Sequence, residues 1–154
     1  MPRRKRPQIS GGYYHVIVRG VAGAHIFMDD PDRRRFVDLL LKTRNRRRWR
    51  VHAYCLMSTH VHLVIETTEP NVSRGLQWLF SVYAQTFNRR WGRFGHLFAD
   101  RFWSRVVEDD DYFEALCRYV FENPVRAGLC DRAAEWRWNG GLVFSALTGA
   151  THAV

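Results

Sequence analysis

Long apolar segments are missing from this sequence of 154 residues. No apolar run approaches the roughly 18 residues that a membrane-spanning helix needs. Residues 2–7 are basic and contain proline at both ends, so the start of the chain lacks the apolar stretch of a signal peptide. We therefore expect a soluble, cytoplasmic protein without a membrane partner.

Cysteine is also scarce. Cys55, Cys117 and Cys130 form neither an even set nor a C-x-x-C pair, which argues against a disulfide framework and against an all-thiolate zinc site. Cys55 and Cys117 lie in apolar patterns. The three thiols are therefore expected to be reduced.

Lysine contributes only two of the 24 basic residues, and the net charge is +9. The planar guanidinium of arginine suits phosphate better than the point charge of lysine. A basic chain of this kind predicts a polyanionic partner, with nucleic acid first. The alternatives are a basic surface that only confers solubility and a membrane-surface helix, which would need an exposed apolar face that no long helix here offers.

The length and the 46% of hydrophobic residues suffice for one core and leave no room for two ordinary domains. We expect a basic arm over residues 1–12, one domain over 13–130, and a C-terminal extension over 131–154. In the extension, Trp136 and Trp138 are expected to pack back onto the core.

Hydrophobic periodicity predicts alternating strands and helices within the domain. The predicted elements are strands over residues 13–19, 49–57, 60–67 and 101–108, and helices over 29–47, 72–91 and 109–123. The second and third strands are joined by a two-residue step, which predicts an antiparallel hairpin. This order indicates an α+β fold, a ferredoxin-like antiparallel sheet with helices.

Two histidines share one face of the strand predicted over 60–67. Alternate residues of a strand point the same way, so His60 and His62 project together, within reach of one metal ion. The spacing alone is a weak signal, because a chain with seven histidines produces such pairs by chance. An ordinary polar sheet face explains it as well.

The last predicted helix carries Tyr119 and Asn123 on one face, because they are four residues apart. If this helix crosses the histidine-bearing face of the sheet, Asn123 completes a metal site and Tyr119 reaches a phosphate held there. The alternative is a half-buried tyrosine at a helix–sheet contact. Tyr112, seven residues earlier, is a competing nucleophile.

Short motifs follow one another along the chain in an ordered series. They are Tyr14-His15 with Arg19-Gly20, Ala53-Tyr54-Cys55-Leu56-Met57 before His60-Val61-His62, Phe87-Asn88-Arg89-Arg90, Gly95-His96-Leu97-Phe98, Arg101-Phe102, and Tyr119 through Asn123-Pro124-Val125-Arg126-Ala127-Gly128. With these motifs, residues 13–130 resemble the single-tyrosine HUH transposases of the IS200-like type, most closely the REP-associated tyrosine transposases. The chain departs from them at Ser58-Thr59, where many relatives have Pro-Asn, and at Trp138-Asn139-Gly140, where relatives often have Trp-Ser-Ser.

The resemblance implies a ferredoxin-like fold with the histidine motif on a central strand and the catalytic tyrosine on a C-terminal helix. It implies that His60, His62 and Asn123 bind a divalent ion, Mg²⁺ or Mn²⁺. Tyr119 would attack a DNA phosphate to leave a 5′-phosphotyrosine and a free 3′-OH. The expected partner is single-stranded or hairpin DNA. The resemblance does not decide between a monomer and a homodimer with an exchanged helix.

Basic residues outside this set are expected to contact the DNA backbone. Arg19 and His15 lie on the same face of the first strand, and Arg93, Arg101 and Arg105 alternate with aromatic residues that could stack unpaired bases. The alternative for the arginines is a solvated surface, and core packing explains some of the aromatics.

Two other functions remain open at this point. One is a non-catalytic nucleic-acid-binding module, because sheets of this architecture also bind RNA through exposed aromatics. The other is a small zinc hydrolase with water as nucleophile, in which Tyr119 would be dispensable.

Overall fold

The computed structural model describes residues 11–150. The basic arm predicted over residues 1–12 therefore lies, apart from its last two glycines, outside the described residues. Among residues 11–150, no helix has the length and apolar character needed to cross a membrane.

A five-stranded antiparallel sheet forms the middle of the molecule, with strand order β4-β1-β3-β2-β5. The strands are β1 (Tyr13–Arg19), β2 (Arg50–Leu56), β3 (His60–Glu66), β4 (Trp103–Val107) and β5 (Asn139–Gly140). The helices are α1 (Asp30–Arg47), α2 (Val72–Trp91), α3 (Asp110–Phe121), α4 (Asn123–Arg126) and α5 (Phe144–Thr148). The predicted ferredoxin-like α+β fold is confirmed, although β4 is shorter at both ends than the strand predicted over 101–108.

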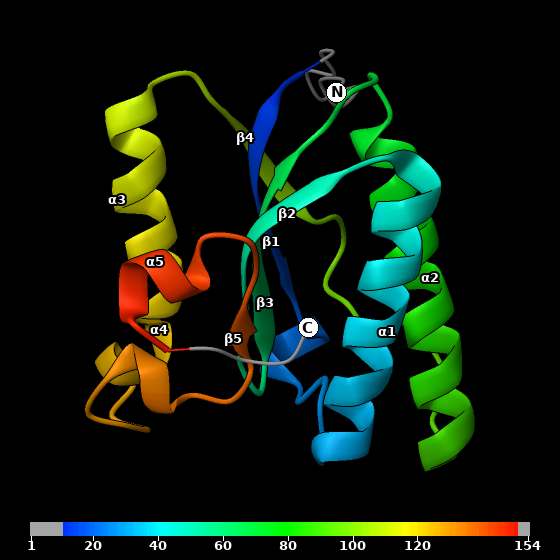
Figure 1. Cartoon of the computed structure of the whole chain (residues 1–154). Helices are drawn as coiled ribbons and strands as arrows, with labels where there is room; N and C mark the ends of the chain where they lie inside the picture. Colours follow the sequence, from blue (N-terminus) through cyan, green and yellow to red (C-terminus); the bar gives the residue numbers. More distant parts are fainter. Residues whose placement is uncertain (1–10, 151–154) are drawn as a thin grey trace.

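The helices form a layer on each side of the sheet (Figure 1). Helices α1 and α2 cover one face, and α3 covers the other together with the short helices α4 and α5. The alternation of the strands explains both layers, because odd and even positions point to opposite faces. Val61, Leu63 and Ile65 of β3 enter the larger core under α1 and α2, whereas Val64 belongs to a smaller core under α3.

Short polar contacts set the start of α1 and α3, which lie on opposite faces of the sheet. The carboxylate of Asp29 accepts a hydrogen bond from the backbone N–H of Asp32 at the start of α1. Asp109 caps α3 in the same way by accepting from Asp111 N–H. Such caps satisfy N–H groups that have no partner inside the helix, and they explain why acidic residues precede both helices.

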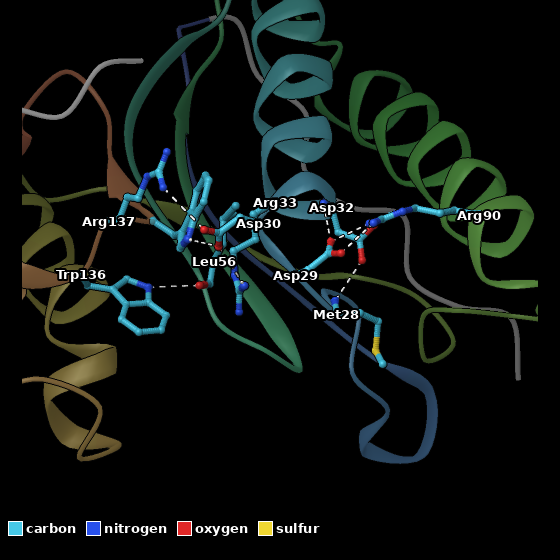
Figure 2. Close-up of polar contacts among 10 residues, drawn as sticks. Met28, Asp29, Asp30, Asp32, Arg33, Leu56, Arg90, Trp136 and Arg137 are labelled. Carbon is cyan, nitrogen blue, oxygen red and sulfur yellow. Dashed lines mark hydrogen bonds and ion pairs between the residues drawn. The ribbon is translucent and has the colours of Figure 1, made fainter.

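The C-terminal extension adds a strand to the sheet. As Figure 2 shows, the indole Nε1 of Trp136 donates to the Leu56 carbonyl at 3.1 Å, and Arg137 reaches Asp30 at 3.5 Å. Trp138 Nε1 also donates to Asp30, at 3.2 Å. These contacts confirm that the tryptophans pack back onto the core, and they hold β5 beside β2. The segment that departs from the family pattern, residues 138–140, is thus the one that forms β5.

All three cysteines are unpaired, and Cys55 and Cys117 are buried. This agrees with the expectation of reduced thiols. Both lie in the smaller core under α3, where burial raises the pKa of Cys117 to about 12. These thiols pack as small apolar side chains.

Gly75 of α2 lies so close to the Trp49 ring that a larger side chain at this position should destabilise the fold. A Cβ added at Gly75 would lie 2.2 Å from the Trp49 ring, and Trp49 is held by a 2.7 Å hydrogen bond from its Nε1 to Asn71. In an open helix, Gly→Ala stabilises by about 1 kcal/mol. Here we expect Gly75→Ala to lower the free energy of unfolding by about 1–3 kcal/mol, as measured by urea denaturation. Ser81→Ala on the exposed side of α2 is the control. If Gly75→Ala proved more stable than the wild type, Gly75 would not lie this close to the Trp49 ring.

Candidate active site

Three histidines meet on the sheet face that carries α3. His60 and His62 lie on β3 with their ring centroids 5.2 Å apart, as expected from their spacing. His15 of β1 joins them, because its Nε2 lies 3.1 Å from Nδ1 of His62 and the two rings stack at an interplanar angle of 16°. The shared bond requires one imidazole to donate and the other to accept.

Burial keeps these imidazoles neutral. Only 3% of His62 and 5% of His15 are exposed. Burial lowers the pKa of His62 to about 3, helped by neighbouring His15 and His60 and by two arginines, and it lowers the pKa of His15 to about 4, helped by Arg105. Burial and Arg19 also lower the pKa of His60, against a hydrogen bond with Asn123 that raises it. Neutral imidazole is the form that binds metal ions.

Helix α3 places Tyr119 beside His62. The two ring centroids are 6.1 Å apart in an edge-to-face arrangement, and half of Tyr119 is exposed. The Arg126 guanidinium lies 4.0 Å from the centroid of the tyrosine ring and donates to the Tyr119 carbonyl at 2.8 Å. Tyr112 contacts Arg105 of β4 instead, at 5.7 Å, so Tyr119 is the α3 tyrosine that contacts the histidine pair.

Only Glu122 separates α3 from the short helix α4, and Asn123, the first residue of α4, lies beside the histidine pair. Pro124 lies in the first turn of α4, and the Asn123 amide N–H₂ donates to the carbonyls of Tyr119 at 3.3 Å and Val120 at 3.1 Å. Because Asn123 also hydrogen-bonds His60, its side chain joins the end of α3 to the histidine pair. Thr59, at one departure from the family pattern, lies with its hydroxyl 3.2 Å from Nδ1 of His60.

A metal ion at this position would need donors beyond the two β3 imidazoles. Within residues 11–150, no group of three or more His, Cys, Asp or Glu side chains is arranged to hold a metal. Two neutral imidazoles and the Oδ1 of Asn123 are therefore the donors that this part of the chain offers. Such a mixed N/O set suits Mn²⁺, accommodates Mg²⁺ and does not exclude Zn²⁺.

The predicted phosphate-binding residues do not all reach the site. Arg19 is paired with His60 across β1 and β3, and Arg105 is paired with His15 across β1 and β4. Arg93 instead bonds Asn88 and the carbonyls of residues 95 and 96, which shapes the loop after α2. Arg101 lines a separate cavity of about 510 Å³ between α2 and residues 95–102.

Two residues at the site were not singled out by the sequence. Arg126 was visible only as part of the Asn123–Gly128 motif, because Pro124 interrupts the helical spacing that would relate it to Tyr119. Trp103 was one aromatic among several, and the structure sets it edge-on against His15, with ring centroids 5.2 Å apart.

The model of one protein family, described as "Transposase IS200 like", matches residues 8–123. The match includes the histidine pair, Tyr119 and Asn123. The chain belongs to the IS200-like transposase family. No curated protein matches this transposase significantly.

Solved structures share the fold of the transposase. One is a REP-associated tyrosine transposase bound to a REP hairpin, with a TM-score of 0.75 and 17% identity, where the match covers 95% of this chain and 84% of that one. Another is a putative transposase from Deinococcus radiodurans R1, with a TM-score of 0.53 and 15% identity over 75% of this chain and 93% of that one. At these identities the likeness concerns the fold.

Proposed function

We propose that this transposase cleaves and rejoins single-stranded DNA next to a hairpin, with Tyr119 as the nucleophile. The observation that carries the proposal is the position of the Tyr119 ring, between His62 at 6.1 Å and Arg126 at 4.0 Å, in a half-exposed place that a DNA strand can reach. The relative bound to a REP hairpin and the net charge of +9 support hairpin DNA as the substrate.

The cleavage step exchanges one phosphodiester for another. The Tyr119 hydroxyl oxygen attacks the phosphorus, the bond from phosphorus to the 3′ oxygen breaks, and a 5′-phosphotyrosine remains. The phenol proton passes to solvent, and the leaving 3′ oxygen takes up a proton to become a free hydroxyl. Because the bond made resembles the bond broken, attack of a 3′-OH on the phosphotyrosine rejoins the strand.

Two arginines lie beside the proposed nucleophile and the proposed metal ligands. Arg126 covers one side of Tyr119, and Arg19 lies opposite His60 in the sheet. Guanidinium groups bind non-bridging phosphate oxygens by charge-assisted hydrogen bonds. In this role the two arginines orient the phosphate toward the tyrosine and offset the charge that develops on it.

His60, His62 and Asn123 are the residues that would hold a divalent ion, Mg²⁺ or Mn²⁺. Their fit rests on the neutral state of both imidazoles and on the amide that hydrogen-bonds His60. A bound ion would polarise the phosphate, which matters because a phenol is a weak nucleophile at neutral pH. Tyr119 and the two histidines lie together within one chain in this arrangement.

His15 would act by fixing the orientation and tautomer of His62. When Nδ1–H of His62 donates to His15, the other ring nitrogen of His62 keeps its lone pair for a metal ion. His15→Phe retains a ring and removes the acceptor. We expect the Kd for Mn²⁺ to rise by about 10- to 100-fold, as measured by titration calorimetry without DNA. An unchanged Kd would remove this role, and His15→Gln, which keeps an acceptor, should recover part of the affinity.

The function is tested with a labelled single-stranded oligonucleotide that carries a hairpin. The protein is incubated with it and Mn²⁺ or Mg²⁺, and a denaturing gel is searched for a covalent protein–DNA adduct. An adduct that forms only with metal supports the proposal. Binding without an adduct would favour the non-catalytic module, and cleavage without an adduct would favour water as the nucleophile.

A further inference from the structure

Trp103 extends the candidate active site toward the edge of the sheet. It begins β4, and its cross-strand partner is Ile17, which in turn faces His62. Paired residues of neighbouring strands point to the same face, so Trp103, Ile17 and His62 form one row on the α3 face. The contact of Trp103 with His15, at 5.2 Å between centroids, agrees with this placement.

Helix α3 covers this part of the face unevenly. Its apolar residues pack with Cys55 of β2, Val64 of β3 and, at the far end of β4, Val107, and its Tyr112 ring contacts Arg105. At the near end of β4, 48% of Trp103 is exposed. A half-exposed indole beside a buried histidine cluster is poorly explained by core packing.

A positively charged side chain lies on the same face of β4 as the Trp103 indole. Arg105 points to the same face two residues along β4, where its cross-strand partner is His15. Beyond it, residues 108–111 are all acidic and would repel phosphates. The basic and aromatic surface is therefore short, and it leads from the histidines to the middle of β4.

We propose that Trp103 and Arg105 guide the unpaired DNA strand at the active site, with Trp103 stacking on a base next to the scissile phosphate and Arg105 binding the adjoining phosphate. The proposal rests on the proposed function, because it names the partner of this surface as the strand that Tyr119 attacks. An indole face binds any unstacked base, whereas a base-paired stem would keep its bases stacked within the helix. The favoured partner is thus single-stranded DNA.

A fluorescent base reports such stacking directly. Single 2-aminopurine substitutions are moved along the unpaired part of the hairpin oligonucleotide, and fluorescence is read on binding to Tyr119→Phe protein in EDTA, where cleavage cannot occur. We expect quenching at one position or two adjacent ones. Adding Trp103→Ala should abolish that quenching and weaken binding about tenfold, and Trp103→Phe should keep part of both.

Control variants separate this surface from general effects. Phe94 is 93% exposed and lies outside β4, so Phe94→Ala should leave the quenching profile unchanged. Arg105→Gln should reduce the slope of log affinity against log salt by about one. Quenching that survives Trp103→Ala, or that Phe94→Ala removes equally, would overturn the proposal. If the wild-type protein formed no adduct, the proposed tyrosine chemistry would be wrong. The stacking proposal would still be tested, because stacking is measured without cleavage.

Discussion

Tyr119→Phe is expected to abolish the proposed covalent protein–DNA adduct and to lower the rate of strand cleavage by at least about 10⁴-fold. The substitution removes one oxygen and leaves the ring between His62 and Arg126. Because half of the side chain is exposed, the loss of the hydroxyl costs the fold little, and DNA binding should be retained. Adduct formation is followed on denaturing gels, and binding by fluorescence anisotropy.

Tyr112→Phe is the matched comparison. Tyr112 lies on the same helix with a similar exposure, 42% against 50%, yet its ring contacts Arg105 and not the histidine pair. A protein with Tyr112→Phe should still form the adduct. If the adduct persisted in Tyr119→Phe and vanished in Tyr112→Phe, the nucleophile would be assigned to the wrong tyrosine.

The parts of the site that follow from local periodicity were predictable. His60 and His62 share a face because a strand repeats every two residues, and Tyr119 lies on the exposed side of α3 because a helix repeats every 3.6 residues. The Asp29 cap at the start of α1 and Gly92 at the end of α2 are equally local signals. For this reason the order of helices and strands agrees with the prediction. The central position of β3 in the sheet also agrees, but it was implied by the family resemblance and not by periodicity.

What the sequence left open depends on long-range pairing. The bond between His15 and His62 needs the register of β1 against β3, which no local pattern specifies. Arg126 contacts Tyr119 from α4, a separate short helix whose placement after α3 no single periodic pattern specifies. β5 has two residues, too few for a periodic signal, and it is held by the tryptophan contacts to Leu56 and Asp30. The loop bonds of Arg93 are local in sequence, but they follow no helical or strand repeat that would predict them.

The second large effect is expected at the proposed metal ligands. His60→Ala should lower the rate of strand cleavage by about 10³-fold or more, since a bound ion supplies several kcal/mol of stabilisation to the developing charge. Affinity for DNA should change only a few-fold, because arginines supply most of it. His60 is more exposed than His62, so its replacement disturbs packing less. Rates are compared at saturating DNA, with EDTA-treated wild-type protein as the metal-free reference.

Metal binding itself can be read without any cleavage. A ligand that binds only the folded state stabilises it by RT ln(1 + [L]/Kd), about 2.7 kcal/mol at a hundredfold excess over Kd. Mn²⁺ should therefore raise the unfolding temperature of the wild-type protein, and this shift should disappear in His60→Ala. His96→Ala, which removes an exposed histidine of the loop after α2, should keep the shift. If His60→Ala still responded to Mn²⁺ as the wild type does, the ion would bind elsewhere, and the two β3 histidines would be an ordinary part of the sheet face.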